Sequence, residues 1–395
     1  MNTLRGRALD ESVAGAPFNQ AAATPTAGPE NQTASQRLVS LDVLRGFDMF
    51  WIIGAASLVA GLRQISDSGP IKFVADQLEH QDWEGVHFED LIFPLFIFIV
   101  GVSVVFSLTK TIQESGRNAA LKRIFRRAVL LYSLGIIYYG GFTAQFEHIR
   151  LLGVLQRIAL CYLFAALLFC YLKPRGLVVV CVGLLVGYWA LMTLVPVPGF
   201  GHGNFAEGKN LANYLDKQYL PLRKWDVDHD PEGLLSTLPA IATCLLGVFA
   251  GLLLQNKSIR DQRKVVYLTG AGMAGVALGW LWGLQFPVIK KLWTSSYVLV
   301  AGGYSALLMA LFYQVVDIWK YQKWAQPLVW IGMNAITIYM AVSLVDFPKI
   351  ARRFVGGELN TYFGVYGDLT VAVTSLLLEF WLLHFLYRRK IFLRV

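Results

Sequence analysis

Two histidines and several acids crowd a short stretch just before a long apolar run. His80, Glu84 and His87 follow one another at steps of four and three residues, so they would share one face if the stretch were helical. Imidazole and carboxylate groups can bind zinc or transfer protons. Gly85 weakens a helix here, no third histidine is near and the His-Glu-x-x-His order is absent, so we expect no metal. A surface histidine near the lipid headgroups is the alternative interpretation.

A second group of charges lies within an apolar segment. Asp42, Arg45 and Asp48 follow one another at three-residue steps and therefore share a helical face. A carboxylate at the depth of Asp48 would cost a few kcal/mol if it faced lipid. We therefore expect Asp48 to face the interior of a helix bundle and to pair with Arg45. These three charged residues are equally consistent with an ion pair that stabilises helix packing and with a functional site.

Three alternating acids that begin at Asp226 resemble the first half of a calcium-binding loop. An EF-hand needs glycine at the sixth position and glutamate at the twelfth, where this chain has Pro231 and Thr237. The segment is therefore not an EF-hand. Asp230 and Glu232 precede an apolar segment, and we expect them to act as acids at the amino end of a helix, where they favour the helix dipole.

The composition identifies the elements that must position these groups. Of 395 residues, 55% are hydrophobic and 15% are charged, whereas soluble domains are about 45–50% apolar and about 25% charged. At roughly 20 residues per crossing, we expect an all-α, polytopic membrane bundle of about ten helices. The expected spans are 43–62, 89–109, 124–142, 152–172, 177–195, 234–255, 265–284, 295–318, 325–344 and 367–387.

The basic residues predict the orientation of these spans. The net charge of +9 does not indicate nucleic-acid binding here, because Lys and Arg accumulate in cytoplasmic loops of membrane proteins. With the amino terminus inside, 22 Lys and Arg lie on the inner side, six of them in an expected loop over 110–127, and 12 lie outside. We therefore expect both termini in the cytoplasm. Residues 1–36 are expected to form a disordered cytoplasmic tail, and 37–395 the transmembrane domain.

Other chemical sites are not indicated by the sequence. All four cysteines fall within expected spans without metal-ligand spacing, so we expect them to be packing residues; they are Cys161, Cys170, Cys181 and Cys244. A glycine-rich phosphate loop followed by Lys-Ser or Lys-Thr is missing, which argues against an ATP-driven pump.

An ordered series of short motifs between residues 37 and 345 resembles the transmembrane heparan-alpha-glucosaminide N-acetyltransferase family, and within it the bacterial NagX-like members. One such motif is weak evidence, but a series in the same order is strong. The motifs are Leu41, Asp42, Arg45 and Gly46; His80, Trp83 and Gly85; Asp90, Leu91, Phe93 and Pro94; Gly153, Gln156 and Arg157; Asp230, Pro231, Glu232 and Gly233; Lys291, Leu292, Trp293, Thr294, Ser296, Tyr297 and Val298; Val316 and Asp317; and Gly332, Met333 and Asn334.

The resemblance implies an enzyme of the bacterial inner membrane. It would transfer acetyl from cytoplasmic acetyl-CoA, as co-substrate, to the amine of an amino sugar on the periplasmic side, and the family's active-site histidine corresponds to His80. Acyl transfer to an amine needs a base, and a histidine suits that task. Glu84 or Asp82 would orient His80. Direct transfer and an acetyl-histidine intermediate both stay open.

Further polar residues are candidates for binding the two substrates. Basic side chains that could meet the phosphates of CoA are Arg45, Lys122, Arg123, Arg126 and Arg127; ordinary positive-inside topology explains their presence as well. Polar residues that could line the passage for the acceptor or the acetyl group are Asp48, Asp90, Gln156, Arg157, Asp230, Glu232 and Asn334. The lipid bilayer is the expected surrounding, and a second copy of the chain is a candidate partner.

A secondary transporter of amino sugars is the rival interpretation, since it would place the same polar residues along a substrate pathway. Transporters often contain two similar halves with broken helices. Pro94 and Pro239 each follow acids near the start of a span, which is a faint sign of such a repeat. A transporter has no need of a CoA site, so we prefer the transferase.

Overall fold

The computed structural model describes residues 38–66, 68–141 and 145–392. The expected disordered tail, 1–36, lies outside these residues. Within them the regular secondary structure is helical, as expected for an all-α membrane bundle. The first helix begins at Val39, and the last helix ends at Arg388.

Eight helices in the described part of the chain are long and apolar enough to cross a membrane, or nine if one bent pair counts as a single span. These candidate spans contain the helices α1 (Val39–Ile65), α3 (Ile92–Tyr138), α4 (Val154–Tyr171), α5 (Pro174–Leu194), α7 (Thr237–Gln255), α8 (Asp261–Gly283), α9 (Ser295–Phe312) and α14 (Gly367–Arg388). The bent pair is α10 (Gln326–Met333) and α11 (Ala335–Leu344), which meet at 74°. The shorter helices are α2 (Gly69–Gln77), α6 (Leu211–Tyr219), α12 (Phe347–Val355) and α13 (Glu358–Phe363).

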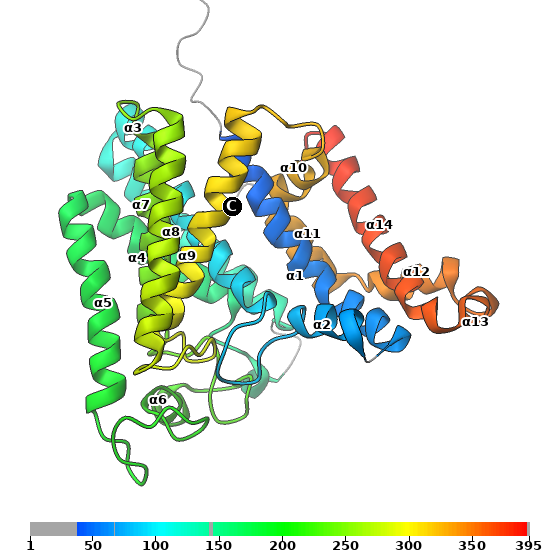
Figure 1. Cartoon of the computed structure of the whole chain (residues 1–395), viewed down its shortest axis with the longest axis horizontal. Helices are drawn as coiled ribbons and strands as arrows, with labels where there is room; N and C mark the ends of the chain where they lie inside the picture. Colours follow the sequence, from blue (N-terminus) through cyan, green and yellow to red (C-terminus); the bar gives the residue numbers. More distant parts are fainter. Residues whose placement is uncertain (1–37, 67, 142–144, 393–395) are drawn as a thin grey trace, which may run out of the picture. The chain divides into compact units, whose positions relative to one another are not determined.

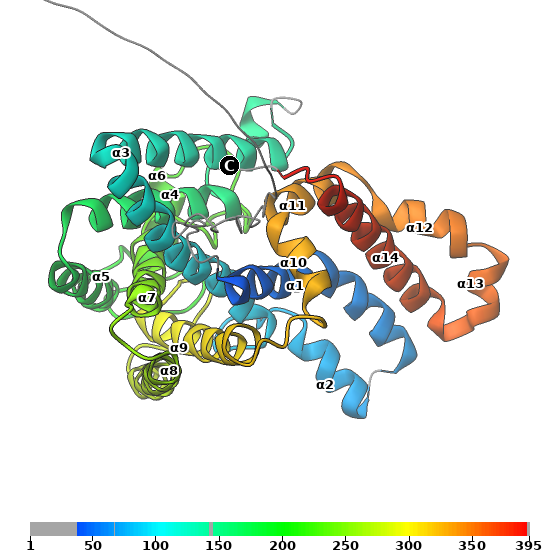
Figure 2. The same ribbon diagram turned by 90° about the horizontal axis from the view of Figure 1, so that it is seen from above.

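Four connecting segments gather at one end of the helices and are called the loop layer below. They are residues 78–88, 145–153, 196–236 with α6, and 285–294. Figure 1 shows this layer at the bottom of the view, whereas α1 begins and α14 ends toward the opposite end. Seen from above, α1 lies beside α10 and α14 (Figure 2), in agreement with the packing of these helices on one another. The loop layer holds most of the polar groups considered below.

Helix α3 differs from the expected pattern, because the predicted loop over 110–127 is wrong. Instead, two helical stretches meet within this segment at Gly116, which has a non-helical conformation (φ 80°, ψ 172°) that a residue without a Cβ adopts readily. A straight helix of 47 residues would be about 70 Å long, far more than a hydrocarbon core of about 30 Å. Both ends of α3 adjoin the loop layer, so its two halves run in opposite directions about this break. Two crossings in α3 would bring the described spans to ten, a number that stays a prediction.

Small residues allow the central helices to pack closely. A Cβ on Gly101 of α3 would collide with the carbonyl oxygen of Cys244 in α7, and one on Gly247 would collide with the carbonyl oxygen of Phe98. Such contacts between small residues are typical of helices in membranes. The interface holds α3 against α7, and α3 also packs on α4. The amino end of α3, where the chain leaves the loop layer, is thereby fixed.

The four cysteines are buried and free, as expected of packing residues. Cys161 and Cys170 lie in α4, Cys181 in α5 and Cys244 in α7. Their burial within helices leaves them no role in the loop layer.

Candidate active site

His80 lies in the loop layer with two charged neighbours. Its side chain is exposed, and Nδ1 lies 3.1 Å from Oδ1 of Asp90. The Nζ atom of Lys290 lies 2.8 Å from Nδ1 of His80 and 3.2 Å from Oδ1 of Asp90. Burial lowers the pKa of Lys290 below its ordinary value, although nearby carboxylates, Asp90 the strongest, oppose the shift. The three residues combine an accessible imidazole, a carboxylate and an amine in one place.

Asp90 is held rigidly at the start of α3. Its side chain is fully buried, and Oδ2 accepts hydrogen bonds from the backbone N–H groups of Gln81 (3.1 Å) and His87 (2.9 Å). The hydroxyl of Tyr297 in α9 donates to the Asp90 carbonyl oxygen at 2.5 Å. Because two backbone N–H groups hold Oδ2, Asp90 presents Oδ1, which makes ion pairs but no hydrogen bond, to His80 and Lys290 in a fixed direction.

The loop that carries His80 is fastened to two other segments of the loop layer. Gly85 donates from its backbone N–H to the carbonyl oxygen of Val288 at 2.9 Å, and Glu84 forms an antiparallel bridge with Ile289. The indole N–H of Trp83 donates to the carbonyl oxygen of Phe205 at 3.0 Å. The bridge brings the segment that contains Lys290 beside His80.

This loop geometry corrects the expectation for the group that orients His80. Residues 80–88 are not helical, so His80, Glu84 and His87 do not share a helical face. Glu84 and Asp82 are exposed, and the carboxylate against the imidazole belongs to Asp90. The ring of His87 is engaged elsewhere in this loop, with Nδ1 3.0 Å from the carbonyl oxygen of Glu79.

The charged face of α1 also differs from the prediction. The Arg45 guanidinium donates to Asp42 (3.3 Å) and to Oγ of Ser103 (3.0 Å) rather than to Asp48. It also reaches the carbonyl oxygen of Gly332 at 3.4 Å. Asp48 faces the interior as expected, but neither carboxylate oxygen has a hydrogen-bond partner among the described residues. The predicted pair between Arg45 and Asp48 is wrong, because Arg45 instead joins α1 to α3 and α10.

Arg150 forms a buried ion cluster that the sequence did not reveal. Its guanidinium binds Asp230 through Nε (2.9 Å) and Nη2 (2.6 Å), and Nη2 also donates to Glu232 at 2.5 Å. The rings of Tyr139 and Trp225 lie against it, with centroids 4.6 and 4.9 Å away. Asp230 and Glu232 therefore neutralise an arginine, and the expectation that they act at a helix end is wrong, since α7 begins only at Thr237.

Arg157 and Gln156 are buried at the start of α4 beside this cluster. Nη2 of Arg157 donates to Oγ of Ser236 at 2.5 Å and to the carbonyl oxygen of Gly233 at 3.3 Å. Its guanidinium also stacks on Trp293, 4.9 Å from the ring centroid. Nε2 of Gln156 donates to the carbonyl oxygen of Arg150 at 3.3 Å. Both residues brace the loop layer against the helices.

Asn334 sits at the bend between α10 and α11, where the backbone departs from helical geometry. Its side chain is buried, and both its amide atoms lack a hydrogen-bond partner in the described part of the chain. A buried amide without a hydrogen-bond partner raises the free energy of a protein in a membrane interior. Asn334 therefore stays a candidate for the passage.

Arg45, one of the five basic residues expected to meet CoA, lies in α1, and the other four lie in α3, away from His80. They are Lys122, Arg123, Arg126 and Arg127, all beyond the break at Gly116. Arg123 donates to Oγ1 of Thr111 at 3.0 Å, and Arg127 stacks on Tyr162. The middle of α3 lies toward the end of the helices away from the loop layer (Figure 1). The structure therefore does not bring these cations together with His80.

Sequence reasoning missed Lys290 and Arg150 as site residues. In the sequence, Lys290 lies in a short loop beside a second lysine, and Arg150 follows an apolar span with no motif around it. Neither position differs from an ordinary basic loop residue. The sequence did contain a signal for Asp90. This acid stands at the start of a span, ten residues after His80, and the two side chains can meet if the loop between them folds back. Nothing local identifies the partners of Lys290 and Arg150.

Comparison with known proteins points to one family. Residues 37–277, more than half of the chain, match the family model described as heparan-alpha-glucosaminide N-acetyltransferase, catalytic. The human protein named heparan-alpha-glucosaminide N-acetyltransferase is 28% identical over 378 residues, which cover 80% of this chain and 56% of that protein. The mouse protein of the same name is 28% identical over 330 residues, with 68% and 50% coverage. The chain spans about half the length of the curated relatives it matches.

Proposed function

Because this chain belongs to the heparan-alpha-glucosaminide N-acetyltransferase family, we propose that it is a multi-pass membrane enzyme that transfers acetyl from acetyl-CoA to the amine of an amino sugar. The donor is used from the cytoplasm, the acceptor is bound at the loop layer, and the membrane is a bacterial inner membrane. The observation that carries the proposal is the contact of an exposed His80 with the buried carboxylate of Asp90 and with Lys290.

In the proposed reaction His80 acts as the general base. We assign the Nδ1 proton of His80 to the side of Asp90, whose Oδ1 lies 3.1 Å away. The lone pair on Nε2, which lies 3.2 Å from Nζ of Lys290, then takes the substrate proton once this ammonium turns toward the acetyl group. The amine nitrogen then bonds to the acetyl carbon, the carbon–sulfur bond to CoA breaks and CoA leaves as a thiolate. The amine proton passes to Nε2. The Lys290 amine beside the imidazole supplies positive charge for the oxyanion that develops on the acetyl oxygen.

A covalent route uses the same atom. If His80 attacks the thioester first, Nε2 bonds to the acetyl carbon and the CoA thiolate leaves before the acceptor binds. The acceptor amine then bonds to the acetyl carbon, the bond from Nε2 to that carbon breaks, and the amine proton passes to the freed Nε2. Asp90 keeps the same imidazole nitrogen exposed in both routes.

The donor must reach His80 from the opposite side in this proposal. The cations of α3 are candidates to bind the CoA phosphates, and the unpartnered Asp48 and Asn334 lie inside the helices between the two sides. Membrane interiors hold such polar groups at substrate pathways. We propose that Asp48 and Asn334 line the passage of the thioester end of acetyl-CoA.

The loop layer is expected to face outward, because the basic residues favour a cytoplasmic amino terminus. A cysteine introduced at Asp82 or Asp228 should then react with a membrane-impermeant maleimide added to intact cells, and one at Arg117 or Arg260 should not. All four positions are exposed, and the native cysteines are buried, so background labelling is low. Labelling at 117 and 260 with protection at 82 and 228 would reverse the orientation.

The transferase reaction is expected in liposomes that contain the protein with its cytoplasmic side inward. Vesicles loaded with acetyl-CoA labelled in the acetyl group and supplied outside with glucosamine should yield labelled N-acetyl product outside and free CoA inside. The sugar skeleton does not need to cross the bilayer, because only the acetyl group moves. Chromatography of the outer solution measures the product.

The matched control uses vesicles without acetyl-CoA and labelled sugar outside. The proposal requires no uptake of sugar under this condition. Uptake with no acetylated product under either loading would contradict the proposal and indicate transport.

A further inference from the structure

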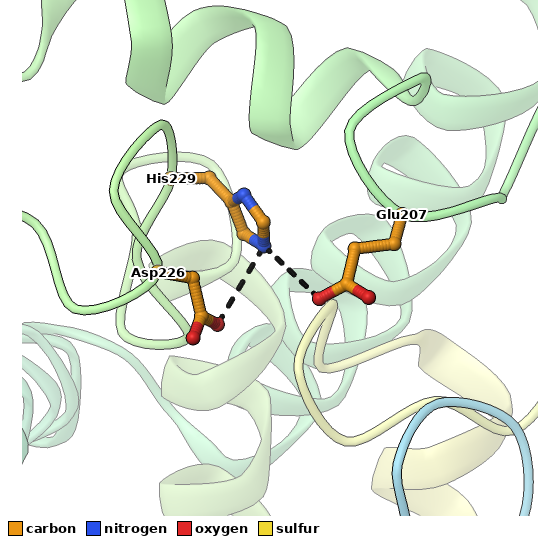
Figure 3. Close-up of side chains that lie close together, drawn as sticks. All are labelled: Glu207, Asp226 and His229. Atoms are coloured by element: carbon orange, nitrogen blue, oxygen red, sulfur yellow. Dashed lines mark ion pairs between the residues drawn. The ribbon is translucent and has the colours of Figure 1, made fainter.

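Three side chains of the loop layer converge outside the candidate active site. Glu207, Asp226 and His229 come from the 196–236 segment, and their ligand atoms lie within 4.8 Å of one another. Figure 3 shows the ring of His229 pointing between the two carboxylates. Its Nε2 lies 3.6 Å from Oε1 of Glu207 and 3.6 Å from Oδ2 of Asp226. These distances are beyond a hydrogen bond but within reach of a shared ion.

His229 is buried without a hydrogen-bond partner. Its side chain is 6% exposed, and neither ring nitrogen makes a hydrogen bond to any residue that the structure describes. Oδ2 of Asp226 is also buried and makes no hydrogen bond to a described residue, and its nearest cation is Nζ of Lys291 at 3.5 Å. Buried polar atoms are nearly always satisfied by protein, water or an ion. An imidazole nitrogen and a carboxylate oxygen that face each other in this state indicate a bound group between them.

The two separations from the imidazole nitrogen suit a small transition-metal ion, and all three ligand atoms lie within 4.8 Å of one another. Zinc binds imidazole nitrogen and carboxylate oxygen at about 2.0–2.2 Å with tetrahedral geometry, which places ligand atoms roughly 3.3–3.6 Å apart. The 3.6 Å separations from Nε2 of His229 are close to this value. Glu207 is half exposed, so a water molecule can complete the coordination.

Lys291 already contacts the same two oxygens. Its Nζ lies 3.0 Å from Oε1 of Glu207 and 3.5 Å from Oδ2 of Asp226. The side chain is 29% exposed, and its flexible stem can swing the ammonium into solvent. A metal ion and this ammonium would compete for one pair of carboxylate oxygens.

We propose that Glu207, Asp226 and His229 form a zinc site in which Lys291 is the competing cation. The imidazole ligand favours zinc over calcium and magnesium, which prefer oxygen ligands in larger number or in octahedral geometry. None of the three ligands contacts His80, although Lys291 follows Lys290, which does. The inference does not depend on the proposed transferase activity. It adds to the sequence analysis, which indicated no metal.

Zinc binding to the purified full-length protein tests the proposal. The protein, without a histidine tag, is treated with chelator, exchanged into clean buffer and titrated calorimetrically with zinc chloride, and bound metal is counted by mass spectrometry. One zinc per chain is expected, with no comparable heat from calcium or magnesium. Glu207→Gln and His229→Gln should each lose stoichiometric binding, whereas Lys291→Met should lower the dissociation constant several-fold.

Asp228→Asn is the matched control, because this exposed acid of the same loop pairs with Lys217 instead. It should bind zinc as the wild type does. Glu207 is exposed enough that its substitution leaves the fold intact, so Glu207→Gln decides the matter even if His229→Gln fails to fold. Substoichiometric zinc in the wild type, or full binding by Glu207→Gln, would overturn the proposal.

Discussion

Replacing His80 with alanine is expected to lower the rate of acetyl transfer about 10²–10⁴-fold, the usual loss when a general base is removed. His80 is the imidazole that Asp90 and Lys290 contact, and its exposed ring allows an acceptor amine to approach. The measurement is the initial rate of N-acetylglucosamine formation with saturating acetyl-CoA. Because the side chain is exposed, its removal should leave the thermal unfolding midpoint nearly unchanged.

Two other histidines of the loop layer serve as controls for this result. His202 is exposed, and the ring of His87 contacts only a backbone carbonyl of Glu79 among the hydrogen bonds of the described residues. His202→Ala and His87→Ala should retain most of the activity. Similar turnover in all three variants would show that His80 is not the base.

Replacing Arg150 with methionine is expected to lower the free energy of unfolding by about 3–5 kcal/mol, the usual effect of removing one partner from a buried ion pair. The guanidinium binds both Asp230 and Glu232, and all three side chains are nearly or fully buried. Methionine would leave two carboxylates without a counter-charge and would also lose the stacking between Tyr139 and Trp225. Reversible unfolding in mixed detergent micelles measures the change.

Lys217→Met is the matched control, because Lys217 pairs with Asp228 where both side chains are more than half exposed. Exposed pairs contribute about 0–1 kcal/mol, so this variant should unfold nearly as the wild type does. Adding Asp230→Asn and Glu232→Gln to Arg150→Met should recover part of the loss. A loss below about 1 kcal/mol for Arg150→Met would mean that the cluster does not stabilise the loop layer.

The sequence by itself predicted the helical class and most of the spans. Hydropathy located α4, α5, α7 and α14 to within a few residues, because the cost of placing polar groups in lipid is a property of each segment alone. The same reasoning predicted the burial of the four cysteines. The helical conformation on both sides of Gly116 within 110–127 was missed. A segment rich in charged residues resembles a loop in composition, although lysine and arginine are good helix formers.

The ordered motifs indicated the family and directed attention to His80, but only the tertiary structure decided which groups meet. Asp90 rather than Glu84 contacts His80, because the intervening loop folds back and pairs with 288–289. Lys290 is 210 residues away from His80, and Arg150 is 80 residues away from Asp230. Hydropathy and local spacing describe neighbours within one helix or turn, whereas these ion pairs form only after distant loops have been brought together by helix packing.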